Sequence, residues 1–319
     1  MKQRIITGTI MVLIIAPLMI VQALKPVYDV MMVVLGIGAM YELIHMFDKD
    51  KKIPIVTRIF AVFLMLVLYA SFVNYIPQCS DTVVVKFLKL VPVNINSNKH
   101  LSDISPLFAI FLVFIVFMSS LVLVRDFTVA DLGRLYIAMI YVSVAVAAMT
   151  ALRQFGVRFI VYLALITSLT DVFALVFGML LGKHKMAPTI SPKKTWEGAI
   201  GGTVTATIVG TLVIIFYPYF SHIFHDGANV EFFDQVFAYN DFTTFGKVSF
   251  VIILTIFLSA CGQTGDLVAS KFKRDFKVKD YSNIFPGHGG ILDRFDSIMF
   301  ASAVFYAFII MEIQLFPLP

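Results

Sequence analysis

The chain has 319 residues, of which 59% are apolar and only 14% are charged, and its formal net charge is +5. Soluble domains carry about 25% charged residues, so this composition excludes an ordinary soluble protein and indicates an integral membrane protein. The two cysteines exclude a disulfide framework, and Cys261, which lies inside an apolar run, is expected to be a small core residue.

Apolar stretches of about 20 residues, the length that crosses a bilayer as a helix, recur along the whole chain. We therefore predict an all-α integral membrane protein, a polytopic bundle of about nine transmembrane helices. No small-residue cleavage site follows the first stretch before Lys25, so it is expected to be a span and not a signal peptide. The predicted spans are Ile5–Leu24, Val27–Met46, Thr57–Ile76, Pro106–Val124, Leu135–Leu152, Val157–Leu181, Ala199–Tyr219, Val248–Val268 and Ser297–Phe316.

The positions of lysine and arginine predict the orientation, because cytoplasmic loops carry the excess of these residues. With the amino terminus inside, 18 of the 25 Lys and Arg fall on the cytoplasmic side, and Arg153 and Arg158 are a pair on the wrong side. Two long connections, Pro77–Ser105 and Ser221–Gly246, then fall outside. The second is acidic and aromatic and is expected to lie along the membrane interface.

No internal repeat or separate soluble module is apparent in the sequence. Residues 1–319 are therefore predicted to form a single membrane-embedded domain. Its catalytic loops are expected at 182–202 and 265–297, in an active-site cavity that faces the cytoplasm.

The sixth predicted span contains a carboxylate, Asp171. A charge at that depth costs about 2.5–3.5 kcal/mol on insertion scales, so a partner must compensate it. Asp171 is a candidate site residue, and the alternative is a structural partner for a hydroxyl or a cation in the bundle.

The segment Gly182–Gly202 combines lysines, hydroxyls, prolines and glycines. Its prolines, Pro188 and Pro192, disfavour a helix, so backbone N–H groups are expected to stay free for an anion. A helix beginning near Thr195 would direct its positive end to the same place. This combination predicts a phosphate site, although charge alone is also typical of an ordinary cytoplasmic loop. The candidate residues are Ser191, Lys193, Lys194 and Thr195.

The densest charge in the chain follows Gly265. Asp266 ends the eighth predicted span, and if its helix continues, Ser270, Lys273 and Arg274 share one helix face with it. That face would offer a metal ligand, a hydroxyl and two phosphate-binding cations.

Asp293 and Asp296 are three residues apart at the start of the ninth span, so they also share a face. Together with Asp266 they are predicted to hold Mg²⁺, which takes oxygen ligands and is usually completed by substrate phosphates. The alternative is a pair of interface carboxylates bridged to Arg294. His288 lies in a glycine-rich turn. It either contacts substrate or has only a structural place in that turn.

Two motifs resemble the signatures of the phosphatidate cytidylyltransferases, also called CDP-diacylglycerol synthases. The first is Ser191-Pro192-Lys193-Lys194-Thr195-Trp196-Glu197-Gly198. The second comprises Ser270-x-x-Lys273-Arg274, Lys279-Asp280, Pro286-Gly287-His288-Gly289-Gly290 and Asp293-Arg294-x-Asp296. The resemblance extends over the chain in span number and loop order.

The resemblance implies transfer of a cytidylyl group from CTP to phosphatidate, with CDP-diacylglycerol and pyrophosphate as products. It implies Mg²⁺ on Asp266, Asp293 and Asp296, with K⁺ as a possible companion ion, and a homodimer in the cell membrane. The residues expected to carry catalysis are Lys194, Asp266, Lys273, Arg274, Asp293 and Asp296. Those expected to bind substrate are Asp171, Ser191, Lys193, Thr195, Ser270, Lys279, Asp280, His288 and Arg294.

Two other functions remain open at the level of sequence. A CTP-dependent polyprenol or lipid kinase would use a similar basic loop but would transfer the γ-phosphoryl group. An ion-coupled transporter would use the intramembrane acids Glu42 and Asp171, although the two halves lack repeat symmetry. No nucleic-acid partner is expected.

Overall fold

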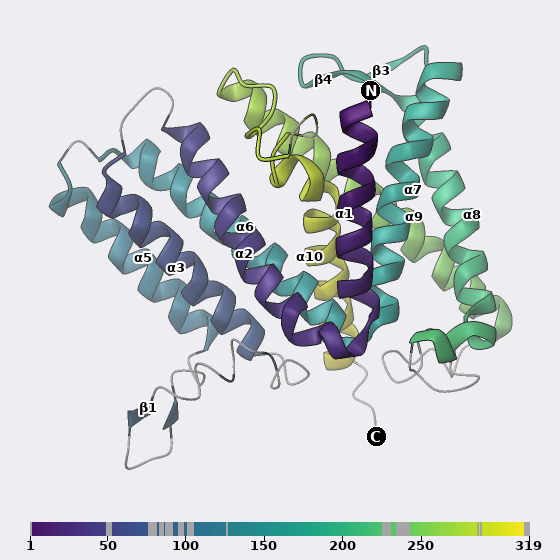
Figure 1. The fold of residues 1–319 in the computed structure, drawn as a ribbon, viewed down its shortest axis with the longest axis horizontal. Coiled ribbons are helices and arrows are strands. Elements are labelled where there is room, and N and C mark those ends of the chain that lie inside the picture. The colour runs from purple at the N-terminus through teal and green to yellow at the C-terminus, as the bar shows by residue number, and fades with distance from the viewer. Residues whose placement is uncertain are drawn as a thin grey trace. The chain divides into compact units, whose positions relative to one another are not determined.

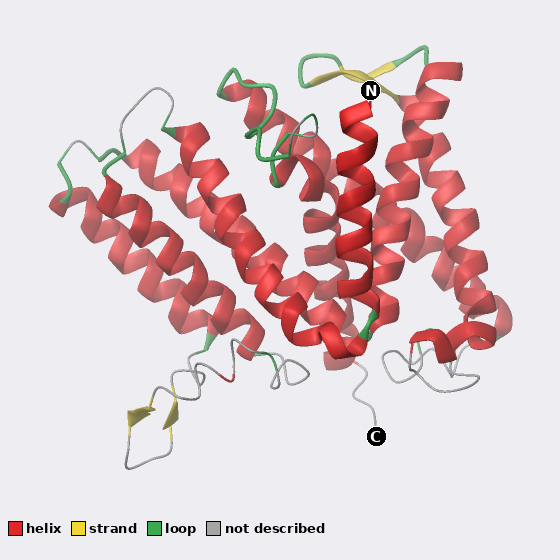
Figure 2. Cartoon of the chain, in the orientation of Figure 1, coloured by secondary structure: helices red, strands yellow, loops and turns green. Residues whose placement is uncertain are grey.

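The structure is a computed structural model. It describes residues 2–48, 53–75, 82, 86, 92–94, 99–100, 105–125, 127–224, 231–233, 243–285, 287 and 289–315. Most of these residues are helical, and the strands among them form two-stranded antiparallel sheets (Figure 2). Within this part of the chain, 8 helices are long and apolar enough to cross a membrane. The protein is therefore an all-α multi-pass membrane protein, as predicted.

The helices are α1 (Lys2–Ile20), α2 (Lys25–Phe47), α3 (Ile55–Asn74), α5 (Pro106–Leu123), α6 (Val129–Phe155), α7 (Val157–Leu181), α8 (Trp196–Phe220), α9 (Thr244–Asp275) and α10 (Leu292–Leu315). Short 3₁₀ helices lie at Gln22–Leu24 and Ser221–Phe224. The strands are β1 (Pro92–Asn94), β2 (Lys99–His100), β3 (Lys185–Ala187) and β4 (Ser191–Thr195).

The eight helices that can cross a membrane correspond in order to the second through ninth predicted spans. α1 forms where the first span was predicted and has 19 residues, of which Thr7–Ile20 form an apolar helical segment. A membrane crossing by α1 stays a prediction. Helix ends also differ from the prediction. α9 continues past Asp266 to Asp275, and α10 begins at Leu292, so Asp293 and Asp296 both lie inside a helix.

Contacts between Cα atoms divide the chain into two compact units. Unit 1 comprises Met1–Leu18, Ala23–Phe155 and Asp275–Arg294. Unit 2 comprises Met19–Gln22, Gly156–Arg274 and Phe295–Pro319. A single domain over the whole chain stays a prediction, and the two units are described separately.

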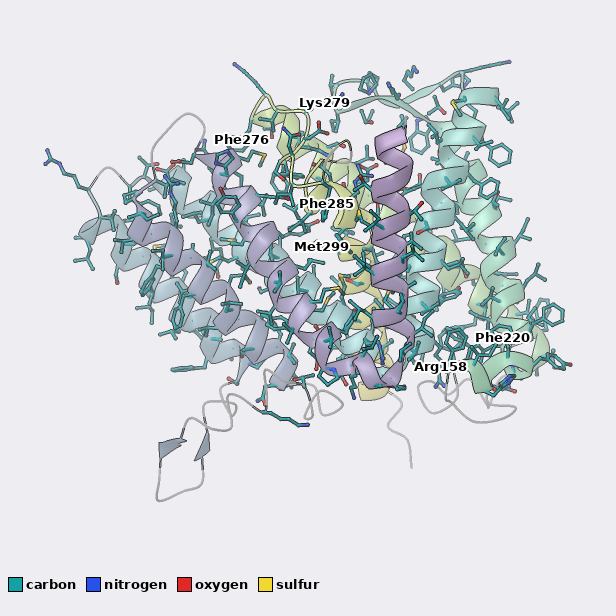
Figure 3. All side chains as sticks on the ribbon, viewed as in Figure 1. Arg158, Phe220, Phe276, Lys279, Phe285 and Met299 are labelled. Carbon is teal, nitrogen blue, oxygen red and sulfur yellow. The ribbon has the colours of Figure 1, made fainter. Side chains whose placement is uncertain are left out.

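In unit 1, α2, α3, α5 and α6 lie side by side (Figure 1). Their contact is largely apolar and is fixed by buried tyrosines: Tyr28 donates to the Met149 carbonyl at 3.1 Å, and Tyr69 and Thr150 share a hydrogen bond of 3.1 Å. The segment after α9 joins this unit at one end. Its Phe276 ring, labelled in Figure 3, lies 5.0 Å from the Phe47 ring at the end of α2.

The unexpected position of Arg153 has a structural cause within unit 1. Arg153 is only 1% exposed and interacts electrostatically with the buried Asp29, which also accepts a hydrogen bond of 3.1 Å from Gln154. The charge of Arg153 is therefore offset inside the bundle and does not act as a loop charge. A buried, paired arginine does not weaken the orientation that the loop charges predict.

In unit 2, α7 and α8 lie side by side because small residues recur every fourth position along α8. These residues are Gly198, Gly202, Ala206 and Gly210. A Cβ atom at Gly202 would lie 2.5 Å from the Thr170 carbonyl oxygen of α7. The glycines that seemed to belong to the phosphate loop therefore serve helix packing.

The end of unit 2 opposite the β3–β4 hairpin is an aromatic cluster. Figure 3 shows Arg158 and Phe220 at this end of α7 and α8. Phe232 and Phe233 are 2% and 0% exposed, and their rings lie 5.5 and 6.1 Å from the ring of Phe159. Phe232 and Phe233 are therefore part of the core, and the expectation that this connection lies along the membrane interface stays a prediction.

Candidate functional site

The predicted phosphate segment forms a β-hairpin between α7 and α8 (Figures 1 and 2). The segment is non-helical, as its prolines predict. The expectation that its N–H groups stay free is only partly correct: Ile190 N–H donates to the Ala187 carbonyl at 3.2 Å, and Trp196 N–H donates to the His184 carbonyl at 3.0 Å. Side chains of the hairpin, more than its backbone, are therefore available to an anion.

Thr195 is the N-cap of α8, which confirms the predicted helix start. Its Oγ1 accepts a hydrogen bond of 3.2 Å from Gly198 N–H, and the residue is 4% exposed. This cap satisfies one of the amide donors that a helix start leaves unpaired. It also holds the neighbouring Lys194 at the positive end of the α8 dipole.

Lys194 reaches from the hairpin to α9. Its Nζ lies 2.5 Å from Asp266 Oδ2, and Ser270 Oγ donates to Asp266 Oδ1 at 3.4 Å. The side chains of Lys194 and Asp266 are 23% and 28% exposed, while the Lys194 Nζ atom itself is buried against Asp266. Two of the predicted catalytic residues are thus in direct contact.

Asp296 extends this group from α10. It is 7% exposed and interacts electrostatically with Asp266, Lys273 and Asp171. α9 and α10 approach closely at Gly265, where a Cβ atom would lie 2.8 Å from the Asp296 carbonyl oxygen. Absence of a side chain there lets carboxylates from two helices come together. We define the charged cluster as Asp171, Lys194, Asp266, Lys273 and Asp296.

Arg274 connects the end of α9 to the tip of the hairpin. Its Nε donates to the Ile190 carbonyl at 3.1 Å. As predicted, α9 stays helical through Ser270, Lys273 and Arg274. Ser191 and Lys193 lie on β4 of the same hairpin, and Lys193 is exposed. Unit 2 therefore holds both the basic hairpin and the acids of the charged cluster.

An apolar groove of about 400 Å³ runs between α8 and α9 in unit 2. It begins at the hairpin with Met186 and Trp196 and continues along residues such as Ile200 and Ile256. Gln263 adds a polar group, which donates to Thr203 Oγ1 at 2.9 Å. A hydrocarbon chain fits a lining of this kind, next to residues that suit a phosphate.

The other predicted residues belong to unit 1. Lys279 (labelled in Figure 3), Asp280 and Arg294 are exposed. Asp293 is half-buried, and its Oδ2 accepts hydrogen bonds from Tyr281 N–H at 2.8 Å and Gly290 N–H at 2.9 Å. Its carboxylate therefore orders the loop that precedes α10. The meeting of Asp293 with Asp266 stays a prediction, and His288 lies outside the described residues.

Sequence reasoning missed the role of Glu42, which it considered only as a coupling acid of a transporter. Glu42 is 0% exposed and accepts hydrogen bonds from Ser282 Oγ at 2.5 Å, Ile291 N–H at 2.7 Å and Leu292 N–H at 2.9 Å. The available signal was a glutamate within an apolar span. Such a residue requires a partner, but the sequence does not identify which one.

Across the described ranges, no group of three or more His, Cys, Asp or Glu side chains is arranged to hold a metal ion. The chemistry of the charged cluster nevertheless suits Mg²⁺, which usually binds through one or two carboxylates, water and substrate phosphates. Asp266 and Asp296 supply such carboxylates, and a cation between them would relieve their repulsion.

Comparison with known proteins agrees with this chemistry. Residues 2–311 match the model of a family described as the cytidylyltransferase family. The phosphatidate cytidylyltransferase of Bacillus subtilis (strain 168) is 31% identical over 310 residues, which is 96% of each chain. That of Staphylococcus haemolyticus (strain JCSC1435) is 40% identical over 174 residues, or 54% of this chain and 57% of the relative.

That of Staphylococcus aureus (strain COL) is 38% identical over the same 174-residue length. The chain thus spans about 57% of the staphylococcal relatives that it matches. Neither a lipid kinase nor a transporter is favoured by these similarities. The family model covers almost all of the sequence, and the chain belongs to the cytidylyltransferase family.

Proposed function

We propose that this protein transfers a cytidylyl group from CTP to phosphatidate, producing CDP-diacylglycerol and pyrophosphate. The observation that carries the proposal is the contact of Lys194 with Asp266 inside the charged cluster. A cation that suits phosphate and carboxylates that suit a divalent ion meet there, beside an apolar groove. Family membership and the names of the relatives support the same reaction.

The reaction is an in-line displacement. An ionised phosphate oxygen of phosphatidate attacks the α-phosphorus of CTP and forms a new P–O bond. The bond from the α-phosphorus to the bridging oxygen of the β-phosphate breaks, and pyrophosphate leaves with its electron pair. Positioning and charge stabilisation dominate such phosphorus chemistry, so the site needs no strong general base.

The side chains of unit 2 have distinct tasks in this scheme. Lys194 and Lys273 stabilise the negative charge of the phosphates, and Arg274 is suited to grip two oxygens at once. Ser270 and Ser191 position substrate oxygens by hydrogen bonds. Lys194 is poised for this task because its ammonium group is already held at the site by Asp266.

Mg²⁺ is the proposed cofactor, with K⁺ as a companion ion, and it would neutralise charge that develops on the phosphates. Asp266 and Asp296 would hold it, with Asp293 as the third carboxylate. The carboxylates of this chain would also keep Lys194 and Lys273 oriented towards the phosphates.

We also propose that the site opens to the cytoplasm at the level of the cell membrane and that the protein is a homodimer. The excess of lysine and arginine in the loops that carry the site supports this orientation. A site at the ends of the helices lets the lipid keep its chains in the bilayer while CTP arrives from water. The family resemblance supports the dimer.

A product assay tests the reaction. Purified protein is incubated with phosphatidate, Mg²⁺ and CTP labelled at either the α- or the γ-phosphate, with and without a chelator. We expect α-label in the lipid, γ-label in pyrophosphate and no product with the chelator. Label from the γ-phosphate in the lipid would instead identify a kinase, and ion flux in proteoliposomes without CTP would support a transporter.

A further inference from the structure

Glu42 carries a carboxylate at a position where the structure completely excludes solvent. It lies in α2, is 0% exposed, and is surrounded along its helix by apolar residues such as Leu43 and Ile44. A buried carboxylate is tolerated only when other groups satisfy it. The hydrogen-bond donors that do so all come from one segment far along the chain, residues 282–292.

The three hydrogen bonds to Glu42 fix both ends of this segment. Oε1 accepts from Ser282 Oγ at 2.5 Å and from Ile291 N–H at 2.7 Å, and Oε2 accepts from Leu292 N–H at 2.9 Å. Leu292 is the first residue of α10. Glu42 therefore accepts a hydrogen bond from a backbone N–H group that has no partner within its own helix.

The glycines of the segment are explained by the same contact. Gly290 has no room for a side chain, because a Cβ atom would overlap the carboxylate of Glu42. Gly289 has φ of +86°, and a Cβ atom there would lie 2.8 Å from Asp293 Oδ2. The side chain of Ile291 fills the space above Gly38, one turn before Glu42 on α2. The loop is thus held between two carboxylates, Glu42 and Asp293.

We propose that Glu42 is a positioning residue that sets the conformation of residues 282–285 and 289–292 and thereby the orientation of Asp293 at the start of α10. The inference rests on the proposed function, in which Asp293 is the third carboxylate of the active site. Glu42 does not contact substrate in this scheme. It acts through the loop, whose two ends it joins by hydrogen bonds to a rigid helix.

The substitutions Glu42→Gln and Glu42→Ala remove the hydrogen bonds in steps. Glutamine keeps one acceptor oxygen but presents an NH₂ group to the other donor, so at least one bond is lost. Alanine removes all three. Asp29→Asn is the matched control, because Asp29 is another buried acid of α2 and its partners, Gln154 and Arg153, lie on α6, outside the loop.

The first measurement is hydrogen–deuterium exchange of the backbone amides in detergent-solubilised protein. We expect the amides of Ile291 and Leu292 to exchange about 10–100-fold faster in Glu42→Ala, because each loses a hydrogen bond to a charged acceptor. Glu42→Gln should show a smaller increase, confined to one of the two amides. Asp29→Asn should leave both at the wild-type rate.

The second measurement is steady-state kinetics of lipid product formation. We expect kcat to fall about 10–100-fold in Glu42→Ala, as for other residues that orient a ligating group, while the KM for phosphatidate stays close to that of wild type. Ser282→Ala, which removes only one donor, should reduce kcat less. Asp29→Asn should retain the wild-type kcat.

Two results would overturn the inference. One is unchanged exchange at Ile291 and Leu292 in the Glu42 variants. The other is an equal effect of Asp29→Asn on exchange and kcat, which would indicate general destabilisation of the bundle. If Glu42→Ala does not fold, Glu42→Gln provides both tests, and Ser282→Ala provides the kinetic one. A wild-type protein that makes no CDP-lipid would refute the proposed function, while the exchange measurement would still decide the role of Glu42 in the loop.

Discussion

At the scale of residues, the charged cluster combines attraction and repulsion in a small volume. Lys194 and Asp266 form an ion pair at 2.5 Å, while Asp296 lies within electrostatic range of two other carboxylates. Close carboxylates of this kind store electrostatic free energy that a bound cation releases. An ordinary structural ion pair has no such excess of negative charge. Catalysis is therefore assigned to the residues of this cluster.

Asp296→Asn tests the acidic half of the cluster. Because the amide is nearly isosteric but neutral, we expect the protein to insert and purify normally while turnover falls about 10²–10³-fold, the usual cost of removing one stabilising group from such a site. The rate is measured with saturating CTP and phosphatidate over a range of Mg²⁺ concentrations. A wild-type rate would remove Asp296 from the catalytic residues.

Lys194→Ala tests the basic half. The substitution removes the phosphate-binding cation and leaves Asp266 without its 2.5 Å partner. We expect the KM for CTP to rise about tenfold or more, which corresponds to the loss of a hydrogen bond between charged groups. Lys247→Ala is the control, because Lys247 pairs with Glu231 at 2.7 Å, away from the hairpin. Equal effects of the two substitutions would contradict a specific role for Lys194.

At the scale of elements, close helix contacts bring the site residues of unit 2 together. Small residues on α8 let it lie against α7, and Gly265 lets α9 approach α10. Hydroxyls add polar contacts inside this apolar packing: Ser259 of α9 shares hydrogen bonds of 2.8 Å with Thr170 and 2.9 Å with Thr203. The geometry of the charged cluster therefore depends on residues that carry no charge.

Gly202→Ala tests this dependence. An added methyl group would lie 2.5 Å from the Thr170 carbonyl and 2.9 Å from the Ala174 amide nitrogen, and such overpacking costs about 1–3 kcal/mol. We expect a lower thermal midpoint in detergent and reduced turnover. Gly133→Ala in α6 is the opposite case, because no atom lies within 4 Å of the added Cβ. It should stabilise the helix by about 0.5–1 kcal/mol. Equal midpoints for both variants would contradict the packing argument.

At the scale of the whole molecule, the proposed reaction requires the charged loops to face the cytoplasm. The charge distribution predicts this orientation. Within unit 1, the ends of α2 and α6 and the segment after α9 meet at one end: the Phe47 ring and the Arg134 guanidinium each lie 5.0 Å from the Phe276 ring. Loops predicted to share one membrane side therefore lie at one end of that unit.

Cysteine labelling of intact cells tests the orientation. In a background with Cys79→Ser and Cys261→Ser, Lys185→Cys places a thiol on the hairpin and Thr243→Cys places one before α9, both at exposed positions. A membrane-impermeant maleimide should label Thr243→Cys in intact cells and Lys185→Cys only after permeabilisation. The reverse pattern would place the hairpin outside and exclude cytoplasmic CTP as its substrate.

The sequence alone determined the fold class and indicated the candidate residues of the site. Apolar runs of spanning length and low charge permit only a helical membrane protein, because backbone groups in lipid must be paired within the chain. Helical spacing correctly predicted that Ser270, Lys273 and Arg274 share a helix with Asp266, since α9 does continue to Asp275. These features are local, so composition and periodicity suffice to predict them.

Only the tertiary structure decided which groups are partners. Lys194 contacts Asp266, Glu42 accepts hydrogen bonds from the loop before α10, and Gly202 packs on α7. Each pairing joins segments that are distant in the chain. The sequence shows that a buried charge needs a partner and that a glycine permits close packing, but it does not identify the partner residue. Long-range packing makes that choice, and the chemistry of the site depends on it.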